Sequence, residues 1–363
     1  MRLCARLVIG WVCCSLTTSG WAQEAESGFD LRGSISTEGM YSHAFSSASG
    51  NSPVNGGFQT LLYPTWKVNS HWSFSGAVQV RSQPYFREEY SDSKARAIVV
   101  DVVQANLTYS RFWKQSSLSV RVGQMTTAFG SFMLRYDPAS NYVVDLPPTY
   151  GYYYKPVTSL GLLGAQVDAT VKRFDLRAQI SNSSPANPRT PFDHDQYATW
   201  TAGAGFTIQQ GFRIGTSVYR GPYLDRQYPY FFRGEADPKS LPATAYGLDV
   251  QWGRGAWNAS GELQHFSMAY HVIPTFTEHS GYAELRRTLT PRWYAATRIS
   301  YLRASAFRGS QIYELVAGYR PNRYQLLKFG YQIQQGSAIR GTLQNGAVVQ
   351  LVTTFHALSL AGK

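Results

Sequence analysis

Charged side chains recur at alternate positions inside apolar segments of the sequence, a spacing that suits a wet surface that handles ions. The basic ones are Arg81, Arg121, Arg177, Arg213, Arg286, Arg298 and Lys328. Acids with the same alternation are Asp168, Asp175, Asp249, Glu262, Glu284 and Glu314. We expect these side chains to line one wall around water. Because seven bases nearly cancel six acids, the wall alone would not reject cations.

A second group of polar side chains lies in the long connection of residues 126–158. Its charged and aromatic members are Arg135, Asp137, Asp145, Tyr150, Tyr152 and Lys155. Connections without regular structure that exceed ~12–15 residues are usually functional. The density of proline and tyrosine indicates a packed segment, and we expect it to fold inward and narrow a channel. A compact external lid or a contact between protomers is the alternative.

Signals of an enzyme are weak. Asp193, His194 and Asp195 offer metal-ligating groups, but adjacent residues of a strand or turn point in different directions. His265 and Ser267 share one strand face, as in outer-membrane lipases, without a recognisable nucleophile motif. We therefore predict that the protein is not an enzyme and that it uses neither a metal ion nor a cofactor.

The elements that must position these residues are predicted to be β-strands. Segment after segment alternates apolar and polar residues with period two, which indicates a strand with two different faces. One example is the run from Phe174 to Ser181, where Phe, Leu, Ala and Ile alternate with Asp, Arg, Gln and Ser. Sixteen such segments can be placed between Phe29 and Leu360.

Tight and long connections between these segments alternate strictly. The tight ones lie near 69–70, 113–115, 172–173, 209–211, 253–255, 290–292 and 321–322. The long ones are roughly 43–57, 83–95, 126–158, 182–195, 221–242, 267–275, 304–310 and 335–346. This layout predicts an all-β fold, an antiparallel up-and-down transmembrane β-barrel of about sixteen strands, with turns at one end and loops at the other. Such a barrel is wide enough for an aqueous channel.

The two faces of each predicted strand need different solvents. The apolar row would face lipid, and the polar row would face a wet lumen. Aromatic residues near the strand ends would form the interfacial girdles. A soluble barrel with a packed interior is the alternative, but it would have to bury the charged wall.

The composition agrees with an exported membrane barrel. Of the 363 residues, 15% are charged and 15% are aromatic, whereas about 25% are charged in typical soluble domains. Residues 1–22 resemble a signal peptide, with a basic start, a short apolar stretch and a small-residue cleavage site. We expect residues 23–363 to form a single barrel domain in the bacterial outer membrane, surrounded by its lipid.

The charge of the predicted mature chain is basic. Removing residues 1–22 leaves 32 bases and 22 acids, a net charge of +10, and no cysteine. Most of this surplus must lie in turns, loops and strand ends, where it can enrich anions near the channel mouths. The bases are dispersed along the chain, so we expect no nucleic-acid partner.

A short motif adds a resemblance. Arg121-Val122-Gly123-Gln124 followed by Thr127-Ala128-Phe129-Gly130 is similar to the Gly-Gln … Pro-Phe-Gly segment of the phosphate-selective porin (O/P-like) family. The resemblance implies a sixteen-stranded outer-membrane channel, a homotrimer and a pore lined with bases for anions. Ala128 stands where the family usually has proline. The chain ends in Leu360-Ala361-Gly362-Lys363 rather than an aromatic residue, which puts the register of the closing strand in question.

The function that these observations predict is a porin. We expect a water-filled channel for passive diffusion of small polar solutes or ions, with a weak preference for anions such as phosphate. The alternative is a plugged outer-membrane barrel that acts in surface binding or adhesion.

Overall fold

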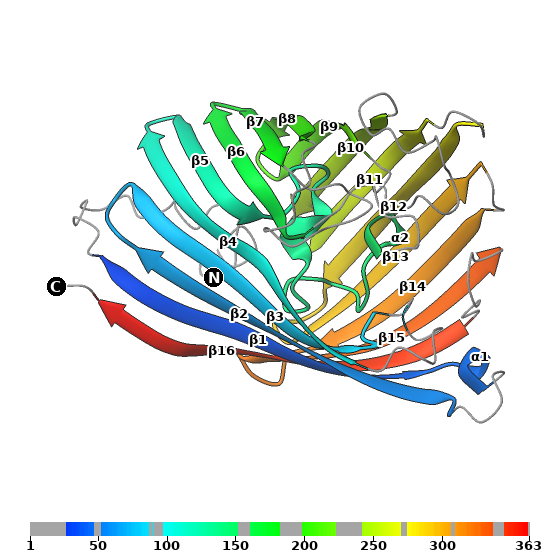
Figure 1. The fold of residues 1–363 in the computed structure, drawn as a ribbon. Helices are drawn as coiled ribbons and strands as arrows, with labels where there is room; N and C mark the ends of the chain where they lie inside the picture. The colour runs from blue at the N-terminus through cyan, green and yellow to red at the C-terminus, as the bar shows by residue number, and fades with distance from the viewer. Residues whose placement is uncertain are drawn as a thin grey trace.

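The computed structural model describes residues 27–46, 52–86, 89, 97–151, 160–181, 198–222, 242–269, 274–305, 309–336 and 345–361. Sixteen β-strands form nearly all the regular structure of this part (Figure 1). Their bounds are β1 Gly28–Tyr41, β2 Val54–Lys67, β3 Trp72–Gln83, β4 Ala97–Trp113, β5 Ser116–Met125, β6 Leu162–Val171, β7 Phe174–Ser181, β8 Thr199–Gln209, β9 Phe212–Pro222, β10 Pro242–Arg254, β11 Trp257–Met268, β12 Phe276–Thr288, β13 Trp293–Ala304, β14 Ser310–Tyr319, β15 Gln325–Gly336 and β16 Asn345–Ala361. The described connections also contain single-turn helices, namely α1 His43–Ser46, the 3₁₀ helix η3 Phe132–Arg135 and α2 Pro148–Gly151.

The strands form one closed antiparallel barrel. Each strand pairs with its neighbour in sequence, and β1 pairs with β16 to close the ring. Long and tight connections alternate along the chain, beginning with the long connection between β1 and β2. All tight turns therefore lie at one end of the barrel, which we call the turn end, and the long connections lie at the other, the loop end. The predicted sixteen-stranded up-and-down barrel is confirmed.

The closing strand has a defined register although it lacks a terminal aromatic residue. Gly28 lies opposite Ala361, and Tyr41 lies opposite Ala347, so the pairing runs along the whole of β1. A bulge between Leu31 and Arg32 shifts the register once. Such a bulge adds an unpaired residue and bends the strand.

Alternation gives each strand an apolar outer row and a polar inner row. On β10, Leu248 is 56% exposed, whereas the next residue, Asp249, is 2% exposed. On β7, Leu176 is 49% exposed, and the inward Arg177 side chain is 15% exposed. Leaving rows of Leu, Ile and Val in water costs about 25 cal/mol per Å², so the outer surface suits an apolar solvent. Among the residues that the structure describes, no helix is both long and apolar enough to span a bilayer.

The buried apolar side chains gather where one connection packs on the inner wall. We call residues 126–151, which follow β5 and end with α2, the lumen segment. Its Phe129 packs in a cluster with Phe266 of β11, and its Val143 packs in a second cluster with Leu326 of β15. The core of the protein therefore lies between the lumen segment and the wall, and this packing positions the polar site.

Candidate functional site

The lumen segment lies inside the ring of strands. Figure 1 shows α2 within the barrel, beside β12 and β13. Hydrogen bonds join the segment to inward-facing residues of β1, β2, β3, β7, β9, β11, β12, β13 and β15. The segment therefore folds back from the loop end and occupies part of the lumen.

The first residues of the lumen segment donate backbone hydrogen bonds to every second strand of the wall, namely β7, β9 and β11. The Ala128 amide donates to Oε1 of Gln179 on β7 at 3.1 Å. The Gly130 amide donates to Oγ of Ser217 on β9 at 3.1 Å, and the next amide, of Ser131, reaches β11. The Phe129 amide donates to Oγ1 of Thr127 at 3.1 Å, so the four consecutive amides from Ala128 to Ser131 all have an acceptor.

Gly130 belongs to the short motif noted in the sequence, and the structure gives a physical reason for glycine. Its φ is +70°, a left-handed conformation that favours glycine. A Cβ atom there would lie 1.8 Å from the Tyr150 hydroxyl oxygen and 2.6 Å from Oε2 of Glu262. The absence of a side chain therefore lets α2 approach the wall.

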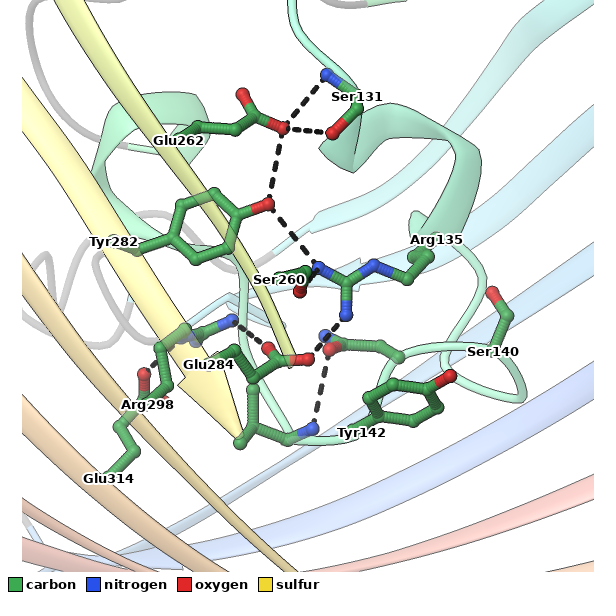
Figure 2. Close-up of polar contacts among 12 residues, drawn as sticks. Ser131, Arg135, Ser140, Tyr142, Ser260, Glu262, Tyr282, Glu284, Arg298 and Glu314 are labelled. Atoms are coloured by element: carbon green, nitrogen blue, oxygen red, sulfur yellow. Dashed lines mark hydrogen bonds and ion pairs between the residues drawn. The ribbon is translucent and has the colours of Figure 1, made fainter. Parts of the chain in front are cut away.

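The carboxylate of Glu262 on β11 accepts hydrogen bonds from the lumen segment and from β12 (Figure 2). Its Oε1 accepts hydrogen bonds from the Ser131 amide at 2.8 Å, the Ser131 hydroxyl at 2.8 Å and the Tyr282 hydroxyl at 3.1 Å. The Tyr150 hydroxyl donates to Oε2. Burial, with the negative charge of Glu262 beside it, raises the pKa of Tyr150 well above its ordinary value. The phenol therefore stays protonated and remains a donor.

Arg135 is the charged anchor of η3. Its guanidinium forms an ion pair with Glu284 of β12, and it donates to Ser260 Oγ at 3.0 Å and to the Tyr282 hydroxyl at 3.3 Å (Figure 2). Burial lowers the pKa of Arg135, but the Glu284 carboxylate together with Tyr282 and Tyr142 raises it by more, so the pKa lies above its ordinary value. The side chain points at the wall, and its charge is compensated there.

The two acids of the segment have different partners. Asp137 accepts from the Ser34 hydroxyl at 2.9 Å and from the Tyr63 hydroxyl at 2.7 Å, which ties the segment to β1 and β2. The Asp145 side chain accepts from the Leu146 amide at 2.7 Å, so it shapes the local turn. Asp137 thus anchors the segment directly, whereas Asp145 contacts the wall through its backbone carbonyl.

Two of the predicted wall bases lie under the lumen segment. Arg298 of β13 pairs with Glu314 at 2.5 Å and donates to the Asp145 carbonyl at 2.8 Å. Lys328 of β15 donates from Nζ to the carbonyls of Pro138 at 2.7 Å and Val143 at 3.0 Å. Both side chains are fully buried, so they hold the segment and do not meet water.

Of the seven predicted wall bases, Arg286 of β12 has its guanidinium 4.5 Å from the ring centroid of Tyr142 in the lumen segment. The remaining four face inward with a partly exposed side chain and an acidic partner. The pairs are Arg81–Glu89 at 2.7 Å, Arg121–Asp168 at 3.4 Å, Arg177–Asp249 at 3.9 Å, Arg213–Asp175 at 2.6 Å and Arg213–Asp249 at 2.5 Å. Arg121 is the most exposed of the four, at 37%. The open part of this wall therefore presents alternating, mutually compensated charges.

Some site residues could not be assigned from the sequence. The alternation placed Glu262 and Glu284 inward, and Tyr282 shares their parity, but no local signal shows that the lumen segment covers them.

Tyr152 and Lys155 lie outside the described residues. Asp193, His194 and Asp195 also lie outside them.

The candidate hydrolase pair lies on the outer face of the barrel. His265 of β11 stands opposite His279 of β12, with the two Nδ1 atoms 3.3 Å apart. Ser267 shares the outward parity of His265. Both residues therefore lie away from the lumen and its network. Within the described ranges, no cluster of three or more His, Cys, Asp or Glu side chains could hold a metal ion.

A closed ring of sixteen antiparallel strands is the fold of bacterial outer-membrane porins, and comparison with known proteins supports that class. An anion-selective porin from Comamonas acidovorans is similar at TM-score 0.60 and 11% identity, over 91% of this chain and all of the other. OprB of Pseudomonas putida has TM-score 0.61 and 12% identity, over 91% and 94% of the chains. OmpF of Salmonella typhi has TM-score 0.56 and 11% identity, over 90% and 97%.

These likenesses show a shared fold at low sequence identity. No family model and no curated protein matches the sequence. The general porin fold is thus established by the structure, whereas the narrower resemblance to phosphate-selective porins stays a prediction.

Proposed function

We propose that the protein is an outer-membrane porin that forms a water-filled channel for passive diffusion of small polar solutes or ions. The observation that carries the proposal is that the lumen segment occupies one part of the lumen, where it is hydrogen-bonded to β11, β15 and β3. On the remaining wall, the inward arginine side chains stay partly exposed; these are Arg81, Arg121, Arg177 and Arg213. The channel would pass between the segment and these bases.

The segment would set the width of this channel, and the wall charges would set its preference. Glu262, Glu284 and Lys328 each hold the segment through buried polar contacts, and these contacts would keep the constriction in place. In a narrow passage few waters remain to screen a charge, so a single exposed base matters. The paired wall supports only a weak preference for anions, and phosphate-like anions are implied by the family resemblance alone.

The setting of the proposed channel is the bacterial outer membrane. The exposed apolar outer rows support contact with lipid, and removal of residues 1–22 would leave the barrel as the exported protein. A homotrimer is part of the proposal, supported by OmpT of Vibrio cholerae, whose solved structure is described as a trimer and has TM-score 0.58 at 10% identity. A non-enzymatic role agrees with the outward position of His265 and Ser267.

Single-channel recording in planar bilayers tests the proposal. We expect stepwise ohmic currents, and a variant with residues 147–155 replaced by a short glycine linker should conduct more than the parent. Unheated protein that migrates as a folded barrel serves as the insertion control. Folded protein that inserts without any conductance would contradict the channel and favour the plugged binding or adhesion barrel.

A further inference from the structure

The tight turns carry a concentrated positive charge that the lumen does not use. They comprise residues 67–72, 111–116, 171–174, 209–212, 253–257, 287–293 and 319–325. These stretches contain ten bases and no aspartate or glutamate, namely Lys67, Arg111, Lys114, Lys172, Arg173, Arg254, Arg287, Arg292, Arg320 and Arg323. In the described part of the chain, none of the ten forms an ion pair. These ten bases of the turn end, which we call the rim, are therefore not paired with an acid in the described part of the chain, although Asp30 and Asp175 lie on neighbouring strand ends.

Aromatic rings share this rim with the bases. Arg254, Trp257 and Arg287 stand side by side on the outer faces of β10, β11 and β12. The Arg287 guanidinium lies 4.9 Å from the Trp257 ring centroid, and Arg323 lies 4.5 Å from that of Tyr324. Amphipathic rings of this kind mark the level of lipid headgroups, so the bases stand at the same level.

One open pocket on the rim combines cations with rings. It is about 490 Å³ in volume and is lined by Gln115, Lys172, Arg173, Phe174 and Phe206. The two phenylalanine rings lie 4.9 Å apart, and both belong to outer rows, of β7 and β8. The apolar side of the pocket therefore faces the surroundings of the barrel rather than its lumen.

The turn that forms the pocket is fixed on both sides. Lys172 and Arg173 are the two residues between β6 and β7; the Lys172 amide donates to the Gln115 carbonyl at 2.8 Å, and the Thr207 amide donates to the Arg173 carbonyl at 2.8 Å. Arg173 also donates from Nη1 to the Ile208 carbonyl at 3.3 Å, which leaves its other N–H groups available. Both basic side chains are exposed at a defined place.

The backbone of this turn does not itself call for a lysine. Lys172 has φ +55°, where glycine or asparagine is favoured and other residues are uncommon. Lysine therefore stands at a position where the backbone favours glycine or asparagine. That observation supports a role for the ammonium group.

We propose that this pocket binds the phosphate headgroup of an anionic phospholipid in the leaflet that meets the turn end. Lys172 and Arg173 would contact the phosphate, and Phe174 and Phe206 would lie against the adjoining acyl chain. The exposed side chain of Leu176 continues the apolar track along β7. A free phosphate would leave both rings unused, so the lipid fits better. The inference rests on the proposed membrane-embedded barrel.

Native mass spectrometry of the purified full-length protein tests the site. Detergent-solubilised protein is titrated with phosphatidylglycerol or with phosphatidylcholine, and bound lipids are counted. The parent should prefer phosphatidylglycerol. The double variant Lys172→Asn and Arg173→Gln keeps a turn-compatible residue and should bind it roughly thirtyfold more weakly, the loss given by two near-surface cations.

A matched control removes two other rim charges by Arg292→Gln and Arg323→Gln, which do not line the pocket. This control should keep most of the affinity. Equal losses in the two double variants would overturn the pocket in favour of diffuse rim binding, and no preference of the parent for phosphatidylglycerol would overturn it outright. Equal binding of glycerol phosphate, which has no acyl chain, would assign the pocket to soluble phosphate. Conductance recorded on the same preparations tests the channel separately.

Discussion

Removing the carboxylate of Glu262 should loosen the constriction without unfolding the barrel. The variant Glu262→Ala deletes three hydrogen bonds to the lumen segment, two from Ser131 and one from Tyr150. A buried hydrogen bond to a charged group contributes about 1.5–3 kcal/mol. Water that enters the new space would satisfy part of the freed donors, so we take the lower value for each bond. The free energy that anchors the segment at this point then falls by about 4.5 kcal/mol, which shifts the equilibrium between attached and detached segment roughly two-thousandfold.

Single-channel recording is the assay for this change. Glu262→Ala should give a higher mean conductance and more open-channel noise, because residues near Ser131 and Tyr150 would leave the wall intermittently. The variant Asp168→Asn is the matched control, since Asp168 pairs with Arg121 and, among the residues that the structure describes, forms no hydrogen bond or ion pair with the segment. Asp168→Asn removes one wall charge and so can alter the current, but it should keep the open-channel noise of the parent. If Glu262→Ala inserts normally and also conducts like the parent, the segment does not limit the current, and our reasoning about the constriction is wrong.

Three further predictions follow from the faces and partners of individual side chains. Leu176→Arg should impair insertion more than Arg177→Leu, because an arginine on the lipid face costs free energy. That cost is about 2–4 kcal/mol at the bilayer midplane and is smaller near the turn end, where Leu176 lies. Equal damage in a heat-modifiability assay would mean that the faces are reversed. Arg121→Gln should move the reversal potential toward cations, most clearly at low salt. Arg135→Gln should move it less, because the Arg135 side chain is 18% exposed, against 37% for Arg121, and its pair with Glu284 is the shorter one. The opposite order would place Arg135 in the conducting path. The Tyr150 anchor should persist as the pH rises through about 10, the ordinary value for tyrosine, because its pKa is raised and a raised pKa delays loss of the donor. An increase in channel noise that begins below that pH would contradict this.

The strand pattern and the topology follow from the sequence because both depend on local information. Leu176 and Arg177 are neighbours, and a β-strand places neighbours on opposite faces whatever lies around them. A tight connection can join only antiparallel neighbours, because parallel strands need a long crossover. Strict alternation of tight and long connections therefore predicts that each strand pairs with the next one in the sequence. The barrel, its two ends and the inward parity of the wall bases could therefore be predicted before the structure.

The site depended on contacts that no local pattern encodes. Arg298 and Lys328 have the parity of lumen residues, yet the lumen segment buries both. Ser131 and Glu262 meet across 131 residues of chain, and Lys328 meets Pro138 across 190. Such pairs form only once the barrel has closed and the segment has packed inside it. The sequence by itself determined which side chains face inward, because that follows from the two-residue period of the strand. The tertiary structure alone decided which of them meet water and which hold the segment, because that depends on the combined packing of parts far apart in the chain.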